Sequence, residues 1–236
     1  MMSEEERPTP TVEDYLGVIY TLARDGEVVI GRKLADWLEV SAPTVTATLQ
    51  RMVRDGWVTM AHDKTIHLTE MGKRAAASVI RRHMLTELLL ARVLGVPWSK
   101  VHAEADRLEH SLSPETTDAV ENLVEDTRFC PHGNPLPGHE ALTQGLIPLL
   151  EAEVGQTYIL ARVHEEIEQN PDLLRFLETR HLMPGTPLCV TAVLPFNETI
   201  TVQAGGIETV LGLNIARHLW VDKSSAEGCP CSTPTE

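Results

Sequence analysis

Three short amphipathic segments open the 236-residue chain, and their spacing leaves few folds open to it. Residues 11–24 carry apolar side chains at helical spacing, which predicts a helix with Thr11 as its N-cap. A second, shorter helix is expected over 31–38. Ser41 followed by Pro43 is a start signal for a third helix, which Gly56 ends.

Two short runs of alternating apolar and polar residues come next, over 57–60 and 66–69, on either side of a polar turn. This pattern predicts a β-hairpin. A helix, a helix-turn-helix pair and a hairpin in this order indicate a winged helix-turn-helix, a fold that presents one helix to the major groove of DNA. We assign residues 1–75 to this domain.

Residues 76–127 are expected to form a helical domain. One long helix is predicted over 70–95, followed by shorter ones over 99–112 and 115–126, the last opened by Ser113 and a proline. These three helices cannot fully bury one another's apolar side chains. The surplus predicts the interface of a homodimer.

The composition changes after residue 127. Residues 128–148 are dense in Pro and Gly and are interpreted as a linker, 149–222 as a small β-barrel, and 223–236 as a disordered tail. The barrel strands are expected over 158–163, 187–193, 200–202 and 215–221, with a helix over 171–179. The predicted fold class is therefore mainly α with a small β domain.

The formal net charge of −14 is unusual for a chain that contacts DNA, but the charge is unevenly distributed. Residues 28–74 hold seven Lys and Arg against five Asp and Glu, whereas residues 76–236 hold 11 against 22. This distribution restricts phosphate contacts to the first of these segments.

No apolar run reaches the roughly 18 residues of a membrane span. The four cysteines form no Cys-x-x-Cys pair, so we expect reduced thiols and a cytoplasmic protein.

The segment 101–110 carries two imidazoles and two carboxylates. On a helix that turns about 100° per residue, His102, Asp106, Glu109 and His110 fall within an arc about 100° wide. Mixed nitrogen and oxygen donors suit a divalent transition metal. A solvated polar face is the alternative, and this helix alone supports both interpretations equally.

Other candidate ligands are explained, one at a time, by ordinary structural roles. His83 and Glu87 stand four residues apart, as an exposed hydrogen-bonded pair would. Asp14 lies in the first turn of the first helix, where it complements the helix dipole. Cys130 and His132 flank a proline in the linker, and we interpret them as part of a structured turn rather than as a ligand pair.

Together these residues closely resemble the diphtheria toxin repressor family of metal-dependent regulators, over about residues 10–221. The resemblance rests on Thr11 to Tyr20, Ser41-Ala42-Pro43-Thr44-Val45, Arg82-His83 with Glu87, Val101-His102 with Asp106 and Glu109-His110, and His132 to Gly138. It implies a winged helix-turn-helix, a helical metal-binding and dimerisation domain, and an SH3-like barrel.

The resemblance also implies the metal ligands. The primary site would use Asp14, Asp106, Glu109 and His110, the ancillary site would use His83, Glu87 and His102, and the SH3-like domain would add Glu165 and Glu168. Iron-responsive members tend to place Met and Cys at the positions of Asp14 and Asp106, so hard oxygen ligands here favour Mn²⁺. Manganese-specific relatives often carry a Glu where this chain has Gly17, which keeps Fe²⁺ as the alternative.

The same resemblance implies which residues contact DNA. Ser41, Pro43 and Ala47 would face bases, Thr44, Thr46 and Arg51 would reach phosphates, and Arg32, Lys33 and Lys64 are candidate backbone contacts. Ala47 replaces a larger polar residue of some relatives and can touch a thymine methyl, but it cannot hydrogen-bond a base edge. We therefore expect an operator different from that of the iron-responsive members.

The predicted function is a manganese-responsive repressor of metal-transport genes that binds palindromic double-stranded operator DNA as a homodimer, and not an enzyme. An iron-responsive regulator of the same family is the first alternative. A metal-independent winged-helix regulator and a His/carboxylate metalloenzyme are the others.

Overall fold

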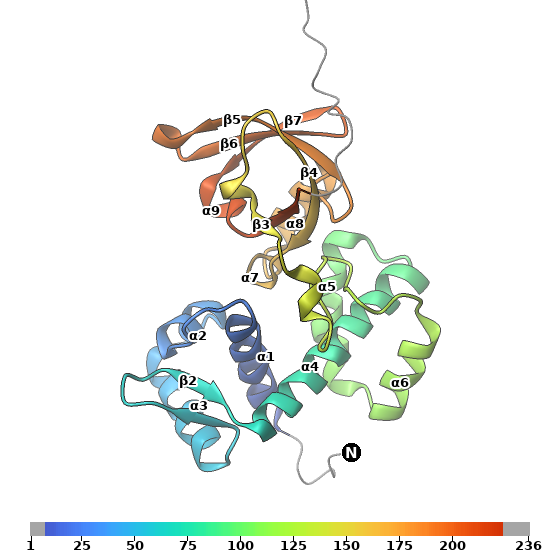
Figure 1. Ribbon diagram of the computed structural model, residues 1–236. Coiled ribbons are helices and arrows are strands. Elements are labelled where there is room, and N and C mark those ends of the chain that lie inside the picture. Colours follow the sequence, from blue (N-terminus) through green and yellow to red (C-terminus); the bar gives the residue numbers. More distant parts are fainter. Residues whose placement is uncertain (1–7, 224–236) are drawn as a thin grey trace, which may run out of the picture. The chain divides into compact units, whose positions relative to one another are not determined.

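The computed structural model describes residues 8–223, which fall into two compact units (Figure 1). Unit 1 comprises the residues up to His83 together with Glu109–Leu112, and unit 2 comprises Met84–Leu108 and the chain from Ser113 onward. The tail expected to be disordered, 223–236, lies outside the described residues except for its first residue, Lys223. No described helix is both long and apolar enough to cross a membrane.

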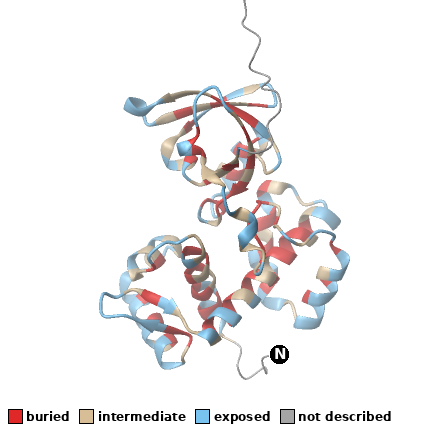
Figure 2. Cartoon of the chain, in the orientation of Figure 1, coloured by how far each residue is buried: buried red, intermediate tan, exposed pale blue. Residues whose placement is uncertain are grey.

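Unit 1 contains the predicted winged helix-turn-helix. Its elements are α1 (Pro10–Arg24), α2 (Gly31–Trp37), α3 (Ala42–Arg54), β1 (Val58–Met60), β2 (Ile66–Leu68) and the first part of α4 (Glu70–Leu88). The two strands pair antiparallel, with Val58 opposite Leu68. Leu16, Leu34 and Met52, one from each of the first three helices, are fully buried and belong to the core of this unit. Figure 2 colours the chain by burial.

The helix starts follow from local chemistry. The Ser41 side chain accepts a hydrogen bond from the backbone N–H of Thr44, as expected of an N-cap. Ser113 does the same for Thr116 at the start of α6 (Pro114–Leu123). The expected cap of α1 was wrong: the cap position is Thr9 and not the threonine at 11, because Pro10 takes the first helical position.

Unit 2 begins with a helical part. After α4 the chain makes a π-helical turn, η2 (Leu89–Val93), so the long helix predicted over 70–95 is α-helical only to Leu88. Helix α5 (Trp98–Leu108) and α6 follow, separated in the chain by the 3-10 turn η3 (Glu109–Ser111) of unit 1. Val93, Leu94, Leu108 and Leu123 remain exposed in this part.

The rest of unit 2 is a six-stranded antiparallel sheet with the strand order β3-β8-β4-β5-β6-β7. The strands are β3 (Ile147–Pro148), β4 (Thr157–Val163), β5 (Pro187–Leu194), β6 (Thr199–Ala204), β7 (Ile207–Gly212) and β8 (Leu219–Asp222). The helices are α7 (Glu165–Glu168), α8 (Pro171–Thr179) and α9 (Leu213–Ala216), with 3-10 turns at Glu140–Thr143, Leu149–Glu151 and Pro195–Asn197. Helix α8 and the sheet share one core around Tyr158, Leu160 and Leu177.

One expectation for this domain was wrong in detail: the strand predicted over 215–221 begins instead with α9 and becomes β8 only at Leu219. Strands β3 and β7 and helix α7 were not anticipated, and β3 lies within the segment predicted as a linker. The predicted class, mainly α with a small β domain, is confirmed.

Candidate metal centres and DNA-contact surface

Three of the predicted metal ligands converge in unit 1. Asp14 comes from α1, and Glu109 and His110 come from η3; their ligand atoms all lie within 4.8 Å of one another. His110 Nε2 is 3.6 Å from Asp14 Oδ1 and 3.5 Å from Glu109 Oε1. One nitrogen and two carboxylates thus face a common point, which we call centre 1.

The buried carboxylate of Glu13 orients the histidine of centre 1. His110 Nδ1 lies 2.8 Å from Glu13 Oε2, and Arg82 donates to the same oxygen at 2.6 Å. A proton on Nδ1 that is donated to Glu13 leaves the lone pair on Nε2, the nitrogen that faces Asp14. Carboxylate partners fix metal-binding histidines in this way. Sequence reasoning missed Glu13, although its spacing of three residues from apolar Leu16, which places both on one face of α1, was a usable signal.

His83 also contacts centre 1. Its Nδ1 lies 2.7 Å from Glu109 Oε2, the oxygen on the far side from His110. The resemblance assigns His83 to the ancillary site, yet within unit 1 it contacts a primary ligand. Glu109 therefore has a histidine beside each of its oxygens.

A second donor cluster lies in unit 2, around His102. Its Nδ1 is 3.1 Å from Glu87 Oε1 and 3.0 Å from Glu168 Oε2, and both carboxylates are buried. Asp106, the neighbour four residues along α5, has Oδ2 3.7 Å from His102 Nε2. Gln169, not among the predicted ligands, places its side-chain nitrogen 2.9 Å from the same ring nitrogen.

Glu165, the other predicted ligand from the SH3-like domain, pairs with Arg162. An Arg162 Nη donates to Glu165 Oε2 at 2.9 Å. Of the two glutamates, it is Glu168 that approaches His102.

The loop at Cys130 and His132 brings two further donors to this cluster. The ligand atoms of Glu87, Cys130 and His132 lie within 4.8 Å of one another, and all three residues are buried. The turn is also structured, as the sequence suggested: Gly133 has φ +85°, and a Cβ there would clash with the Ala161 carbonyl oxygen. We call Glu87, His102, Cys130, His132 and Glu168 centre 2.

The surroundings of centre 2 favour a cation. His132 is fully buried, and neither ring nitrogen makes a well-formed hydrogen bond among the described residues; the nearest carboxylate oxygen, Glu87 Oε1, lies 3.3 Å from Nδ1. Burial by itself would lower the pKa of His132, but the carboxylates of Glu168 and Glu87 outweigh it and raise that pKa. Burial, reinforced by the same two carboxylates, raises the pKa of the Cys130 thiol well above its usual value.

The donor sets of both centres fit a divalent transition metal. Centre 1 offers carboxylate oxygen and imidazole nitrogen, and centre 2 adds a thiol. Buried carboxylates and unsatisfied imidazole nitrogens are costly unless a partner compensates them. A bound cation would do so at centre 2, after the protons on Cys130 and His132 have left.

The start of α3 presents the predicted DNA contacts. Ser41, Pro43, Thr44, Thr46 and Ala47 are exposed, whereas Arg51 is half-buried. Thr46 Oγ1 donates to the Ala42 carbonyl at 2.9 Å. Two of the residues predicted to contact the DNA backbone have acidic neighbours. Lys33 pairs with Glu27, and Arg32 lies 3.7 Å from Asp36.

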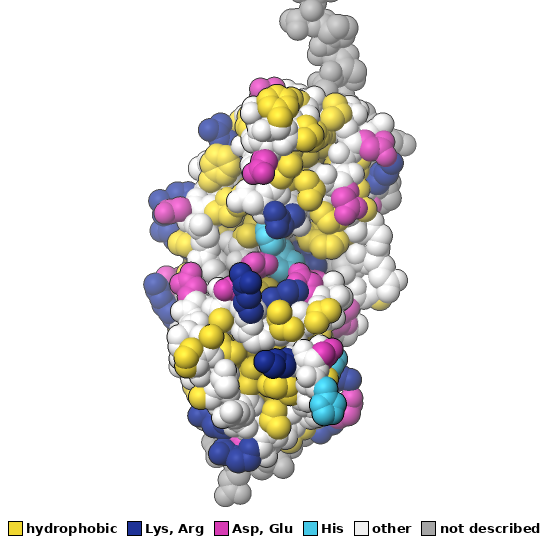
Figure 3. Space-filling view, turned by 90° about the vertical axis from the view of Figure 1, so that its left-hand side faces the viewer, with side chains coloured by type: hydrophobic (Ala, Val, Ile, Leu, Met, Phe, Trp, Pro, Cys, Tyr) yellow, Lys and Arg dark blue, Asp and Glu magenta, His cyan; other side chains and the backbone are white. Residues whose placement is uncertain are grey.

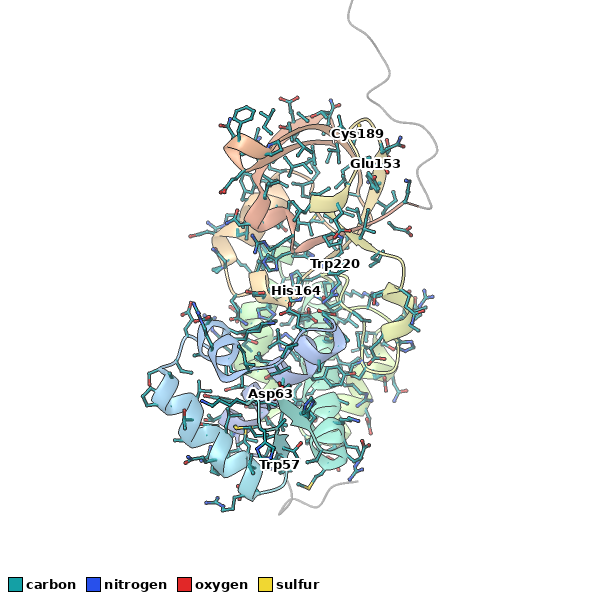
Figure 4. All side chains as sticks on the ribbon, turned by 60° about the vertical axis from the view of Figure 1, so that its left-hand side comes forward. Trp57, Asp63, Glu153, His164, Cys189 and Trp220 are labelled. Carbon is teal, nitrogen blue, oxygen red and sulfur yellow. The ribbon has the colours of Figure 1, made fainter. Side chains whose placement is uncertain are left out.

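Lys64 stands at the tip of the hairpin in a left-handed conformation, with φ 67°. Beside it Asp63, marked in Figure 4, accepts the Thr65 backbone N–H at 3.0 Å, and this hydrogen bond lowers the pKa of Asp63. On the face drawn in Figure 3, Lys and Arg are dispersed among Asp and Glu. On that face, a phosphate contact would depend on the local placement of single cations rather than on a broad basic surface.

Comparisons with known proteins match three segments of the chain to described domains. Residues 8–66 match the iron dependent repressor N-terminal DNA binding domain, residues 69–138 its metal binding and dimerisation domain, and residues 147–223 the FeoA domain. The iron-dependent repressor IdeR of Mycobacterium tuberculosis is 33% identical over 211 residues, which cover 81% of this chain and 92% of the relative. The diphtheria toxin repressor of Corynebacterium diphtheriae is 40% identical over 135 residues, 57% of this chain and 60% of the relative.

Solved structures give the same answer. A manganese-dependent transcriptional repressor in complex with manganese superposes with a TM-score of 0.78 at 31% identity, covering 90% of this chain and 99% of that one. ScaR with bound Zn²⁺ superposes with a TM-score of 0.76 at 28% identity, covering 92% and 100%. Iron and manganese regulators thus both resemble the chain. The chain belongs to the diphtheria toxin repressor family of metal-dependent transcriptional repressors, which are DNA-binding proteins and not enzymes.

Proposed function

We propose that this repressor responds to Mn²⁺, with Fe²⁺ as the alternative, and that the metal-loaded homodimer binds palindromic double-stranded operator DNA in front of metal-transport genes. Its action would lie in the cytoplasm, where bacterial DNA and reduced thiols are found. The observation that carries the proposal is the convergence of Asp14, Glu109 and His110, with Nδ1 of His110 against Glu13 and Nε2 toward the other two carboxylates.

With a metal bound, the residues of centre 1 would link α1 to the turn that follows α5. Without a cation, the carboxylates of Asp14 and Glu109 repel each other across a short distance. A bound cation supplies the positive charge that offsets this repulsion. Asp106, three residues before Glu109, is the proposed fourth ligand by resemblance to the family.

The chain connection explains how such a link would reach DNA. Glu109 and His110 follow α5 directly, and Asp14 belongs to the first helix of the DNA-binding domain. Ligands held together at centre 1 would therefore limit how α1 moves relative to α5. In a dimer this sets the separation of the two α3 helices, and only a separation matching successive major grooves binds well.

The exposed apolar residues of unit 2 support the homodimer. Val93, Leu94, Leu108 and Leu123 are large apolar side chains left in water by a single chain, between 44% and 63% exposed. Helical surfaces of this kind are characteristic of subunit interfaces. We propose that these residues form the dimer contact.

Centre 2 is proposed as a second metal site, confined to unit 2. Glu87 and His102 are contributed by helices, Cys130 and His132 by the loop, and Glu168 by α7. A cation held there would lock the loop and α7 onto the helical part of unit 2. The thiol would make this site softer than centre 1.

DNA titration at one fixed ionic strength tests the proposal. A duplex selected from a randomised pool in the presence of Mn²⁺ is titrated with the protein under chelator, Mn²⁺, anaerobic Fe²⁺, Co²⁺ or Zn²⁺. Mn²⁺ or Fe²⁺ should tighten binding by at least about 100-fold, because a full two-state switch corresponds to roughly 10⁴-fold. Equal affinity in chelator and in every metal would identify a metal-independent regulator and overturn the proposal.

A further inference from the structure

The carboxylate of Glu168 is held from the side opposite centre 2. Glu168 Oε2 faces His102, whereas Oε1 accepts a hydrogen bond from the side-chain amide of Asn134 at 2.6 Å. The same Asn134 nitrogen donates to the Val163 carbonyl at 2.8 Å, and Asn134 is fully buried. Asn134 lies two residues after His132. One short loop therefore carries both His132, a donor of centre 2, and the amide that holds Glu168, another donor of that centre.

Arg162 fixes which way the Asn134 amide points. The buried Arg162 guanidinium donates through Nε to Asn134 Oδ1, and through an Nη to Glu165. It also lies 5.6 Å from the ring centre of Trp220, marked in Figure 4. Because arginine can only donate hydrogen bonds, the amide oxygen must face Arg162 and the amide nitrogen must face Glu168. A flipped amide would place its oxygen against the Glu168 carboxylate and its nitrogen against the guanidinium.

We propose that Asn134 and Arg162 are positioning residues of centre 2, an inference that rests on the metal site proposed above. Arg162 orients Asn134, Asn134 holds Oε1 of Glu168, and Oε2 is thereby aimed at the donors around His102. Hydrogen-bonded partners of ligands are worth about 10–100-fold in metal affinity when removed. The arrangement also couples occupancy of centre 2 to β4 and α7, because Arg162 and Glu168 belong to that part of the SH3-like domain.

Co²⁺ binding to the full-length chain tests this inference. All variants carry Asp14→Ala, which removes a ligand of centre 1, so that the near-ultraviolet absorption of a cobalt–thiolate bond reports centre 2. Asn134→Ser and Arg162→Met should each weaken Co²⁺ binding by about 10-fold or more. The double variant should bind about as weakly as Asn134→Ser alone, because Arg162 acts through Asn134. Asn197→Ser, at an exposed asparagine of the SH3-like domain, is the matched control and should match the background.

The outcomes separate the inference from the site it rests on. If the background protein shows no cobalt–thiolate band, or if Cys130→Ser leaves the band unchanged, centre 2 itself is wrong. If the band is present and Asn134→Ser and Arg162→Met both bind Co²⁺ within twofold of the background, the positioning role is wrong. Losses that simply multiply in the double variant also contradict it, since they would indicate two independent structural effects. Thermal unfolding in chelator checks that each variant is folded. Should Asn134→Ser fail to fold, the Co²⁺ affinity of Arg162→Met tests the positioning role by the same twofold criterion.

Discussion

Asp14→Ala should abolish the metal-dependent gain in DNA affinity while leaving the fold intact. The substitution removes the only donor that α1 contributes among Asp14, Glu109 and His110, so the DNA-binding domain would lose its link to η3. The gain should fall from the two to four orders of magnitude expected of a switch to less than about tenfold. Asp14 is exposed, so the free energy of unfolding in chelator should change by no more than about 0.5 kcal/mol.

Glu70→Ala is the matched control for Asp14→Ala. It removes another exposed carboxylate of unit 1, one that pairs with Lys73 rather than with any donor of centre 1. Its response to Mn²⁺ in fluorescence anisotropy with labelled duplex should equal that of the unmodified protein. An Asp14→Ala protein that still gained affinity in full would show that centre 1 does not control DNA binding.

Arg82→Met should destabilise unit 1 strongly. Arg82 and Glu13 are both 6% exposed, and their ion pair measures 2.6 Å. Removing one member of a buried pair leaves the other charge without its compensation, which typically costs about 3–5 kcal/mol. The free energy of unfolding, measured by urea titration in chelator, should fall by about that amount.

Two further variants make the Arg82 result specific. Arg74→Met, at an exposed position of the same helix, should change the free energy of unfolding by no more than about 0.5 kcal/mol. Glu13→Gln combined with Arg82→Met should recover part of the loss, since neither partner then leaves a bare buried charge. A loss below about 1 kcal/mol in Arg82→Met would mean that His110 alone compensates Glu13.

Local signals explain why much of the fold could be predicted. Ser41 and Ser113 act through hydrogen bonds to residues three positions away, so the sequence nearby contains the information. The missed strand β7 also had a local signal, because Gly205 and Gly206 form the turn that joins it to β6. Helix α9 had none: four residues make no stable helix alone, and packing against the sheet decides their conformation.

The candidate site was predictable in its residue types but not in its geometry. The projection onto one helix face assumed that the helix continues to His110, whereas α5 ends at Leu108 and Glu109 begins a 3-10 turn. A 3-10 turn advances each residue by about 120°, so the projected angles no longer hold. Asp106 thus contacts His102, while His110 contacts Glu13, 97 positions away. Pairings at such separations leave no periodic trace in the chain.

Anomalous diffraction at the manganese edge, from crystals of the full chain grown with Mn²⁺, would test the central claim most directly. The account predicts a peak bonded to Asp14, Glu109 and His110 Nε2. The account would be contradicted if protein that responds fully to Mn²⁺ in DNA binding in solution gave crystals without anomalous density at these three side chains.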